Sequence, residues 1–531
     1  MTGMPDSKSP PRPFYRPEDI AGIAYAEALN DPGAYPYTRG RRPRQDGAAW
    51  IQRELSGEGE PARTNAQFKY LIEKGAMGLD VIGDTPTMAL LDPDHPAAAH
   101  AVGTQGVSLC SLHDYLVLYD GLALDGLTIS NSLPPTFAIA GLYEAAKTRG
   151  IDPAQLRGST VQAPFYCEDC GYATLMPFKL RLRLAADSIE FAAREMPKFH
   201  AFLEDTYYIS EGGLDPVEEM ALGFVEIRYL IRELLRRGLP IDSFAPRIAI
   251  LVNCRMDFFA EIAKIRATRR LFARMLREEF GAQDPRSLAV VIASHTSGLS
   301  LTAQQPINNV IRGAVQSLAL VLAGAQAIEI SGFDEAFRTP SPEAHLVGLR
   351  TQQIVQLETD VTKVADPLGG SYYVESLTNE IEDRIRQMVT RIESMGDPAA
   401  LCDNGWFRAF FQDATERYAR ELQEGTRMQV GANVLRLSPE EDTLLRAVAE
   451  QKIAPCRERI EAIRAFKRAR DAARLRAALG EVRAACAGSD NLMPHIMVAM
   501  RAAATAGEIS GVMRLAYGLA YDPFGMVESP A

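Results

Sequence analysis

Two cysteines and one histidine are of residue types that could carry chemistry by themselves. Cys167 and Cys170 form a Cys-x-x-Cys pair, a pattern that can bind a metal ion or exchange disulfides. The sequence holds no second such pair, so we expect no metal site. His295 follows an apolar run and could donate a proton, but packing against a ligand or the backbone is an equal alternative. Gly369 and Gly370 lack the spacing of a phosphate-binding loop.

The elements that must position such residues alternate along the chain. Short strand-like runs are followed by helical segments, in which apolar residues recur at positions i, i+3, i+4 and i+7. Eight strand–helix units in series favour an α/β fold, a parallel (β/α)8 or TIM barrel, over an open sheet. The expected strands cover residues 78–83, 127–132, 159–164, 201–207, 247–254, 289–295, 327–333 and 362–367.

Three regions are expected. Residues 1–40 are rich in proline and tyrosine and form an extended N-terminal arm, and residues 41–376 form the barrel. Residues 377–531 are helix-forming throughout and make a helical region with a linker-like C-terminus. The charged stretch from about 447 to 485 is either a solvated helical face or a docking surface for another chain.

A barrel gathers its reactive side chains at one mouth, at the strand ends and in the loops that follow them. The expected mouth contains no Ser–His–Asp arrangement, no paired carboxylates and no metal-ligand spacing. So few acids and bases are typical of enzymes whose chemistry is carried by a cofactor, where the protein orients the substrate and excludes water. The mouth segments are 82–84, 130–132, Gln162, 207–211, 253–255, His295 and 331–335.

Composition excludes several classes of partner. The chain has 531 residues, 47% of them apolar, and a net charge of −11, which disfavours nucleic acid or an anionic membrane as the main partner. The N-terminus lacks the pattern of a secretory signal. No apolar run reaches the roughly 18–20 residues of a membrane span. Seven scattered cysteines indicate reduced thiols and a cytoplasmic location.

Three segments carry a resemblance to a known family. They are RTQQIVQLETDVTKVADPLGGSYYVE at 350–375, GFDEAF at 332–337 and ASHTSGLSLTAQQPINNVIR at 293–312. The chain resembles the adenosylcobalamin-dependent acyl-CoA mutases, and the order of segments matches from about Asp31 onward. The resemblance implies an isomerase that binds an acyl-CoA and adenosylcobalamin. Its reaction is a radical 1,2-migration of the thioester group.

The resemblance also implies roles for individual residues. In the family, a Gln in the segment that matches GSTVQ contacts the thioester region, here Gln162, and the Arg of FAPR reaches the CoA phosphates, here Arg247. The Glu of FDEA holds the adenosyl ribose, here Glu335, and a second Glu against the cofactor matches Glu211. Other positions in matching segments are Ser130 and Thr160 on the substrate side, and Gln326, Ser331 and Ala336 on the cofactor side.

Several family positions are changed in this chain. Tyr208 stands where the family has a His that donates to the thioester carbonyl, and His295 replaces a Gln. Leu55 matches the Tyr that wedges against methylmalonyl-CoA, and Gly171 lies near its carboxylate-binding Arg. Ile82 replaces the acidic residue that binds the hydroxyl in the 2-hydroxyisobutyryl enzymes. We therefore expect an apolar acyl pocket and a substrate other than methylmalonyl-CoA. Tyr208, Gln162 and His295 are the expected catalytic residues.

The sequence contains no DxHxxG motif, whose His ligates cobalt in the family. The isobutyryl-type mutases are divided into a large barrel subunit and a small cobalamin-binding subunit. The resemblance therefore implies that this chain is the large subunit of a hetero-oligomer. The alternative is a non-catalytic or redirected family member that binds an acyl thioester or a partner protein.

Overall fold

A computed structural model describes residues 11–43, 50–167, 174–438, 440–449 and 453–530. Within these residues one parallel sheet has the strand order β1-β9-β8-β7-β6-β5-β4-β3-β2. The strands are β1 Ile51–Arg53, β2 Leu55–Ser56, β3 Gly78–Ile82, β4 Thr128–Ser132, β5 Arg157–Gln162, β6 Phe199–Asp205, β7 Ile248–Cys254, β8 Val291–Thr296 and β9 Ala327–Glu329.

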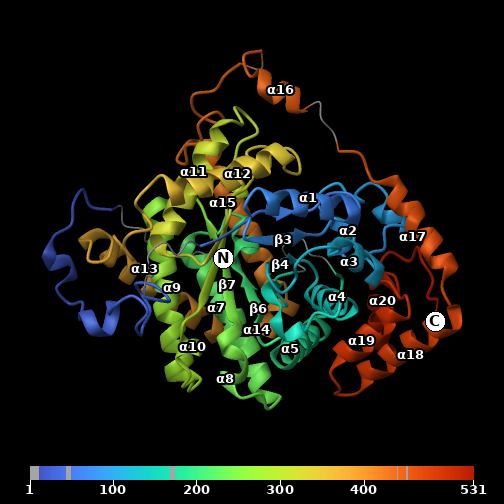
Figure 1. Cartoon of the computed structure of the whole chain (residues 1–531). Coiled ribbons are helices and arrows are strands. Elements are labelled where there is room, and N and C mark those ends of the chain that lie inside the picture. Colours follow the sequence, from blue (N-terminus) through green and yellow to red (C-terminus); the bar gives the residue numbers. More distant parts are fainter. Residues whose placement is uncertain (1–10, 44–49, 168–173, 439, 450–452, 531) are drawn as a thin grey trace.

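The two edges of this sheet meet in one short stretch of chain. β1 pairs with β9 and β2 pairs with β3, and only Glu54 separates β1 from β2. Ile51–Ser56 therefore acts as one interrupted strand that closes the ring, which confirms the (β/α)8 barrel (Figure 1).

One expected strand was wrong and one was missed. Residues 362–367 form turns between two helices, and the eighth barrel strand is instead Ile51–Ser56. Its inward positions hold Ile51, Arg53 and Leu55, so a buried charge interrupts the apolar alternation that marks a strand in a sequence.

Helices cover the outside of the barrel and continue beyond it (Figure 1). Those of the barrel and its loops are α1 Pro61–Glu73, α2 Thr85–Met88, α3 Leu112–Leu118, α4 Pro135–Thr148, α5 Phe178–Glu195, α6 Thr206–Ser210, α7 Pro216–Arg236, α8 Ile241–Phe244, α9 Phe258–Arg274, α10 Pro285–Leu288, α11 Asn308–Ala323 and α12 Pro342–Leu357. Those that follow are α13 Tyr372–Ser394, α14 Pro398–Asp403, α15 Trp406–Glu424, α16 Thr443–Ala449, α17 Arg457–Ala469, α18 Ala472–Ala487, α19 Leu492–Arg501 and α20 Ala506–Ala516.

Strand residues alternate between the outer and the inner face of the barrel wall. Outward side chains such as Leu79, Val81 and Ile129 join the core between the sheet and the helices. Inward side chains make a separate small cluster, whose buried members are Val161, Leu203, Ala249, Leu251, Ala293 and Ala327. Barrel interiors are usually filled by bulky branched residues, so the three alanines leave space on the axis.

One glycine lets two barrel strands approach closely. Gly158 in β5 has φ +139°, and a Cβ there would lie 1.8 Å from the carbonyl oxygen of Ile129 in β4. Any larger residue would push the two strands apart, because the contact is with backbone.

The N-terminal and C-terminal segments pack on the barrel helices. Arg269 of α9 donates to the carbonyl oxygens of Tyr37 and Thr38, which holds the N-terminal segment against the barrel. α13 packs on α7 and α9, and α19 packs on α4 and α5 (Figure 1). The expected boundary at residue 377 falls inside α13. The division of the chain into three regions stays a prediction.

Candidate functional site

Two carboxylates and a phenol meet around Gly298 at the carboxyl end of the barrel. A Cβ at Gly298 would lie 3.1 Å from Glu211 Oε2, 3.4 Å from Glu335 Oε1 and 3.9 Å from the hydroxyl of Tyr207. Burial and the nearby charge of Glu211 raise the pKa of Glu335 to about 8. The expectation of no paired carboxylates at the mouth was therefore wrong. Spacing could not reveal the pair, because Glu211 follows β6 and Glu335 follows β9.

Glu211 is held by three donors, one from β7 and two from the loop that follows β8. Asn253 Nδ2 donates to it at 2.8 Å, the hydroxyl of Ser297 at 2.7 Å, and the backbone N–H of Leu299 at 2.7 Å. Burial still raises the pKa of Glu211, although these donors oppose the rise. The donors fix the side chain, and its Oε2, which accepts from Leu299, lies beside Gly298.

His295 is neutral and held in one orientation. Its Nδ1 lies 2.9 Å from the carbonyl oxygen of Thr296, so Nδ1 carries the proton and Nε2 is an acceptor. Burial lowers the pKa of His295 to about 4. Its ring packs edge-to-face on Tyr207 with centroids 4.8 Å apart. Ser331 donates to the same carbonyl of Thr296 at 2.6 Å, so two expected site residues, His295 and Ser331, lie together.

Tyr208 lies on α6, directly above the end of β6. Its backbone N–H donates to Asp205 Oδ1 at 3.1 Å, and its side chain is partly exposed. Tyr207 packs against the inner cluster of the barrel. Both tyrosines therefore lie just beyond the carboxyl end of β6, at the upper edge of the barrel interior.

Four charged residues of the barrel interior were missed from the sequence. Arg53 and Glu329 are in ionic contact at 2.7 Å, and Asp80 accepts from the hydroxyl of Ser132 at 3.2 Å. Leu79 and Val81 face outward, so Asp80 between them faces inward. Asp205 also faces inward, and burial raises its pKa to about 7. Buried charges of this kind break the apolar pattern and look like loop residues in a sequence.

The expected substrate residues divide between the two faces of the wall. The side chains of Leu55 and Ile82 point toward the barrel axis and are partly exposed. The hydroxyl groups of Ser130 and Ser159 form a hydrogen bond of 2.7 Å. Thr160 donates to the carbonyl oxygen of Asn131 at 3.3 Å. Gly171 lies outside the described residues.

Gln162 faces away from the barrel axis. Its amide donates to Ser188 of α5 at 3.0 Å and to the carbonyl oxygen of Ala201 at 2.9 Å. Its neighbour Val161 occupies the inward position. The structure therefore does not bring Gln162 together with Tyr208 and His295.

Arg247 and Gln326 lie at the amino end of the barrel, opposite Glu211 and Glu335. Arg247 ends the turn before β7, and its Nε donates to the carbonyl oxygen of Pro197 at 2.6 Å. Gln326 precedes β9 and accepts from the backbone N–H of Ile292 at 2.8 Å. Gln326 is thus distant from the loop that carries Ser331, Glu335 and the exposed Ala336.

A cavity of about 860 Å³ opens at this amino end and runs into the barrel. Small inward residues, including Ala249, Ala293 and Ala327, line its deeper part, and Arg53 lies among them. Basic side chains gather at its rim: Arg41, Arg42, Arg157, Lys198 and Arg247. The rim is therefore a site for an anion, and the axis below it can take a narrow chain.

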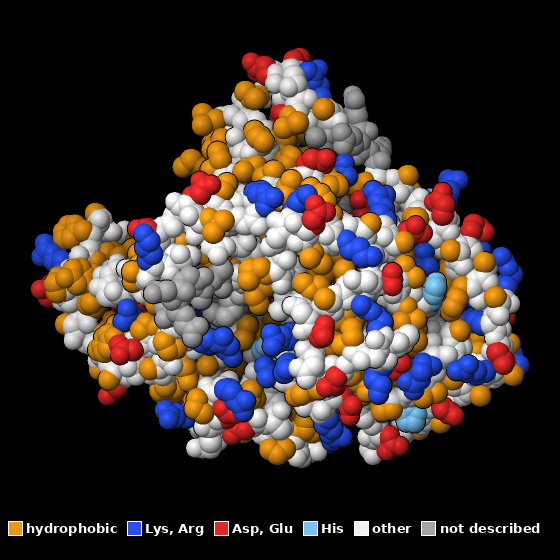
Figure 2. Space-filling model, viewed as in Figure 1, with side chains coloured by type: hydrophobic (Ala, Val, Ile, Leu, Met, Phe, Trp, Pro, Cys, Tyr) orange, Lys and Arg blue, Asp and Glu red, His pale blue; other side chains and the backbone are white. Residues whose placement is uncertain are grey.

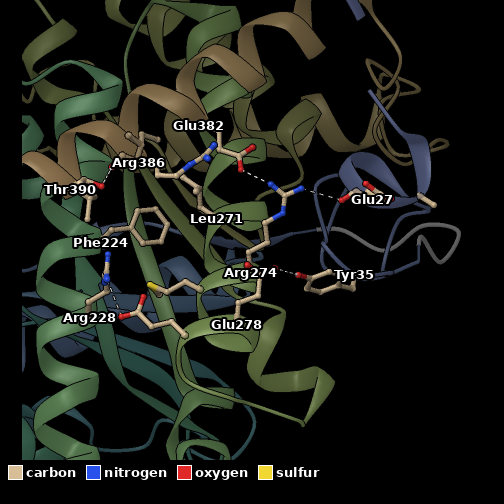
Figure 3. A pocket seen from close by; sticks show the side chains of 15 residues that line it. Glu27, Tyr35, Phe224, Arg228, Leu271, Arg274, Glu278, Glu382, Arg386 and Thr390 are labelled. Carbon is tan, nitrogen blue, oxygen red and sulfur yellow. Dashed lines mark hydrogen bonds and ion pairs between the residues drawn. The ribbon is translucent and has the colours of Figure 1, made fainter. Parts of the chain in front are cut away.

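A second cavity, of about 700 Å³, lies outside the barrel between the N-terminal segment, α9 and α13 (Figure 3). Its charged side chains pair with one another: Arg274 with Glu382 at 2.8 Å, and Arg228 with Glu279 at 3.0 Å. The first pair joins α9 to α13, and Arg274 also donates to the carbonyl oxygen of Glu27 in the N-terminal segment at 3.2 Å. The cavity therefore stabilises the packing of these elements and adds no reactive group.

The remaining candidates do not form a reactive cluster. Cys167 Sγ accepts from Arg181 at 3.3 Å, and Cys170 lies outside the described residues. Arg255 donates to the carbonyl oxygen of Leu214, which directs its guanidinium toward the loop before α7. Among the described residues no group of three or more metal-ligating side chains occurs. No helix in the described part of the chain is long and apolar enough to cross a membrane.

These features define a (β/α)8-barrel protein with a polar site at the carboxyl end and a basic cavity at the amino end. The family model for methylmalonyl-CoA mutase matches residues 5–519. The chain belongs to the methylmalonyl-CoA mutase family. Its homologues are named as CoA mutases, so it is an enzyme of the isomerase class, an intramolecular transferase.

Three relatives show the extent of this similarity. The 2-hydroxyisobutanoyl-CoA mutase large subunit of Aquincola tertiaricarbonis is 34% identical over 500 residues, covering 93% of this chain and 88% of that protein. Methylmalonyl-CoA mutase of Rhizobium meliloti is 33% identical over 512 residues, covering 96% and 71%. The human mitochondrial methylmalonyl-CoA mutase is 32% identical over 514 residues, covering 96% and 67%.

Proposed function

We propose that the chain is the large, substrate-binding subunit of an adenosylcobalamin-dependent acyl-CoA mutase, which moves a thioester group to the adjacent carbon. The observation that carries the proposal is the cavity that enters the barrel at its basic amino end. A CoA ester has an anionic nucleotide at one end and the acyl group at the other. The barrel offers a basic rim at one end and a polar site at the other.

The CoA nucleotide would bind at the basic rim, with Arg247 and Arg157 facing its phosphates. Arginine binds phosphate through several N–H donors, so these side chains suit the role. The arm of the ester would run along the axis past Ala249 and Ala293. The seven residues of β7 span roughly 23 Å at about 3.3 Å per residue, and with a strand tilt of about 36° the distance from rim to mouth along the axis is roughly 19 Å.

The acyl end would lie beneath the residues that follow β6. Leu55 and Ile82 would line its pocket, and the hydroxyl of Tyr208 would donate to the thioester carbonyl. His295 would contribute an acceptor at Nε2, because its proton is on Nδ1. Gln162 has no direct role in this arrangement, since it donates to Ser188 and Ala201 outside the barrel.

The space beside Gly298 fits the ribose of an adenosyl group. Glu211 Oε2 and Glu335 Oε1 face this small residue, and a Cβ there would close the gap. Carboxyl oxygens accept hydrogen bonds from ribose hydroxyls, so both side chains would orient the sugar. Adenosylcobalamin, when bound, supplies the radical that takes a hydrogen atom from the substrate. Ser331 and Ala336, in the loop with Glu335, would lie against it, whereas Gln326 would not.

For the small cobalamin-binding subunit we propose the surface above the carboxyl end of the barrel. Figure 2 shows apolar side chains gathered on this upper part of the molecule. A hetero-oligomer would bury them and close the mouth against water, which protects reactive intermediates. The exposed apolar residues there include Ile307, Ile311, Met428, Leu435 and Leu437, whose exposed fractions range from 48% to 77%.

A cytoplasmic location is part of the proposal. The described cysteines form no disulfide, as is usual for proteins of reducing compartments.

The test is to combine the chain with a small cobalamin-binding subunit, adenosylcobalamin and a panel of acyl-CoAs. Isomerised product from at least one ester is the expected result. Binding of CoA esters without any isomerised product would instead support a family member that only binds thioesters.

A further inference from the structure

The interior of the barrel contains an acid pair with an arginine, formed by Asp80, Glu329 and Arg53 (the polar cluster). We propose that the polar cluster binds a hydroxyl group on the acyl chain and so selects hydroxylated acyl-CoAs. This inference rests on the proposed function and names the substrate class for it.

The polar cluster lies at the level of the acyl pocket. Asp80 is the register partner of Leu55, and Glu329 is the register partner of His295. The third inward carboxyl, Asp205, is close enough to Asp80 to feel its charge, and it caps the helix of Tyr208. The wall around the acyl group is therefore not uniformly apolar, contrary to the expectation from Leu55 and Ile82.

One nitrogen of the polar cluster lacks a partner within the protein. The side chains of Arg53 and Glu329 are only 4% and 2% exposed. Arg53 Nη2 makes no hydrogen bond among the described residues, and the 2.7 Å contact of Nε with Glu329 lacks hydrogen-bond geometry. Buried polar groups nearly always have partners. Because Arg53 also lines the axial cavity, a ligand in that cavity can supply one.

The protonation of the polar cluster matches a hydroxyl. Burial raises the pKa of both Asp80 and Glu329, that of Glu329 well above the ordinary value, and the two carboxyls interact. Burial therefore favours a shared proton on the pair, while the charge of Arg53 favours an ionised carboxylate beside it. A hydroxyl donates to the ionised carboxylate and accepts from the protonated one.

Other acyl substituents fit the polar cluster less well. A methyl group would offer no hydrogen bond to Arg53 Nη2, which would stay without a partner inside the barrel, and this is costly. A carboxylate would meet the two acids with only Arg53 to offset them. An ammonium group offers no acceptor for the acid proton. The chemistry of the polar cluster therefore favours a neutral group that is both donor and acceptor.

The test compares esters that differ only by a hydroxyl or a methyl group. The pairs are 2-hydroxyisobutyryl-CoA with pivaloyl-CoA, and 3-hydroxybutyryl-CoA with isovaleryl-CoA, titrated calorimetrically into the chain. In at least one pair the hydroxylated ester should bind about 10- to 100-fold more tightly, the range of a hydrogen bond to a charged group. Equal or weaker binding in both pairs overturns the inference. So does tighter binding of 3-aminobutyryl-CoA than of 3-hydroxybutyryl-CoA.

Variants locate the preference. Glu329→Gln and Asp80→Asn should each reduce it to within a few-fold while affinity for free CoA is unchanged. Glu226→Gln is the matched control, because Glu226 is also a buried carboxyl with a raised pKa, but it interacts with Glu204 on the outer face of the wall. If the preference for the hydroxylated ester remains in both barrel variants, or is lost in the control, the assignment to the polar cluster is wrong.

The comparison of esters on the unmodified chain needs no variant to fold. If neither free CoA nor any ester binds, the proposed function itself is wrong. If the two esters of each pair bind equally well, only the inference about the hydroxyl group is wrong.

Discussion

Asp205 Oδ1 accepts the backbone N–H of Tyr208 at 3.1 Å, so the last residue of β6 fixes the short helix that carries this tyrosine. Because Asp205 belongs to the barrel wall, the position of Tyr208 relative to the axial cavity is set by the barrel itself. A backbone fixed in this way limits the positions of the Tyr208 hydroxyl, and a donor positioned in advance costs less to align with its acceptor.

Replacing Tyr208 by Phe should therefore slow turnover with little change in the binding of CoA esters. A preorganised donor at an oxyanion site typically contributes on the order of 10²–10³ in rate, and less where little charge develops. A radical migration develops little charge, so we expect about tenfold. The measurement is steady-state turnover with the small subunit and cofactor. Tyr35→Phe is the control, because that hydroxyl contacts Glu278 outside the barrel. An undiminished rate in Tyr208→Phe would show that Tyr208 only packs.

Replacing Arg247 by Ala should weaken the binding of free CoA about tenfold at low salt. Each positive charge at the rim attracts the CoA phosphates. Dissolved salt weakens this attraction, and at 0.1 M salt it is largely screened beyond about 10 Å. The loss should therefore shrink as salt is raised. Arg232→Ala removes an arginine that pairs with Glu279 and Glu393 away from the cavity, and it should bind CoA normally. Equal affinities for both variants would place the nucleotide elsewhere.

The stability of the protein should depend on pH through Glu335. Its folded pKa is about 8, whereas an unfolded Glu titrates near 4.3. Between these values the folded state holds an extra proton, so this contribution to stability is complete below about pH 4.3 and is lost as pH rises to 8. Glu335→Gln should reduce the slope of unfolding free energy against pH by about 1 kcal/mol per pH unit or less, given partial solvation. Denaturant unfolding at pH 5.5, 6.5 and 7.5 measures this slope. Parallel curves for wild type and variant would refute the raised pKa.

Replacing Gly158 by Ala should destabilise the barrel strongly. The added methyl group would lie against the carbonyl of Ile129, so the strands must separate, at a cost of several kcal/mol. Gly150→Ala is the matched control: it also has positive φ, +70°, but nothing lies within 4 Å of the added atom. That control should cost about 1 kcal/mol. Thermal unfolding of the two variants makes the comparison, and similar melting points would contradict it.

The sequence revealed most of the barrel because seven of its strands are continuous buried runs. Runs such as residues 247–254 stand out whatever they pack against, since both faces of the wall are covered. The strand at Ile51–Ser56 was missed because Arg53 and Glu54 are buried charges, and residues 362–367 were mistaken for a strand.

The site could be predicted only where its residues lie in matching segments. Glu211, Glu335, Ser331 and His295 were identified in this way, and the structure brings them to one end of the barrel. Gln162 was expected to contact the thioester region, but alternation from Val161 turns it outward. The polar cluster was not found, because Asp80 and Glu329 are 249 positions apart and only closure of the ring unites them.

Ring closure also has a consequence for synthesis of the chain. The residues that pair across the seam, Ile51 with Ala327, are separated by most of the barrel sequence. On the ribosome the first strand emerges long before its partner, so its edge stays open until the last strand has been made. An unpaired strand edge invites association with other chains. Nascent chains of this protein therefore have a long interval in which protection by a chaperone would be most effective.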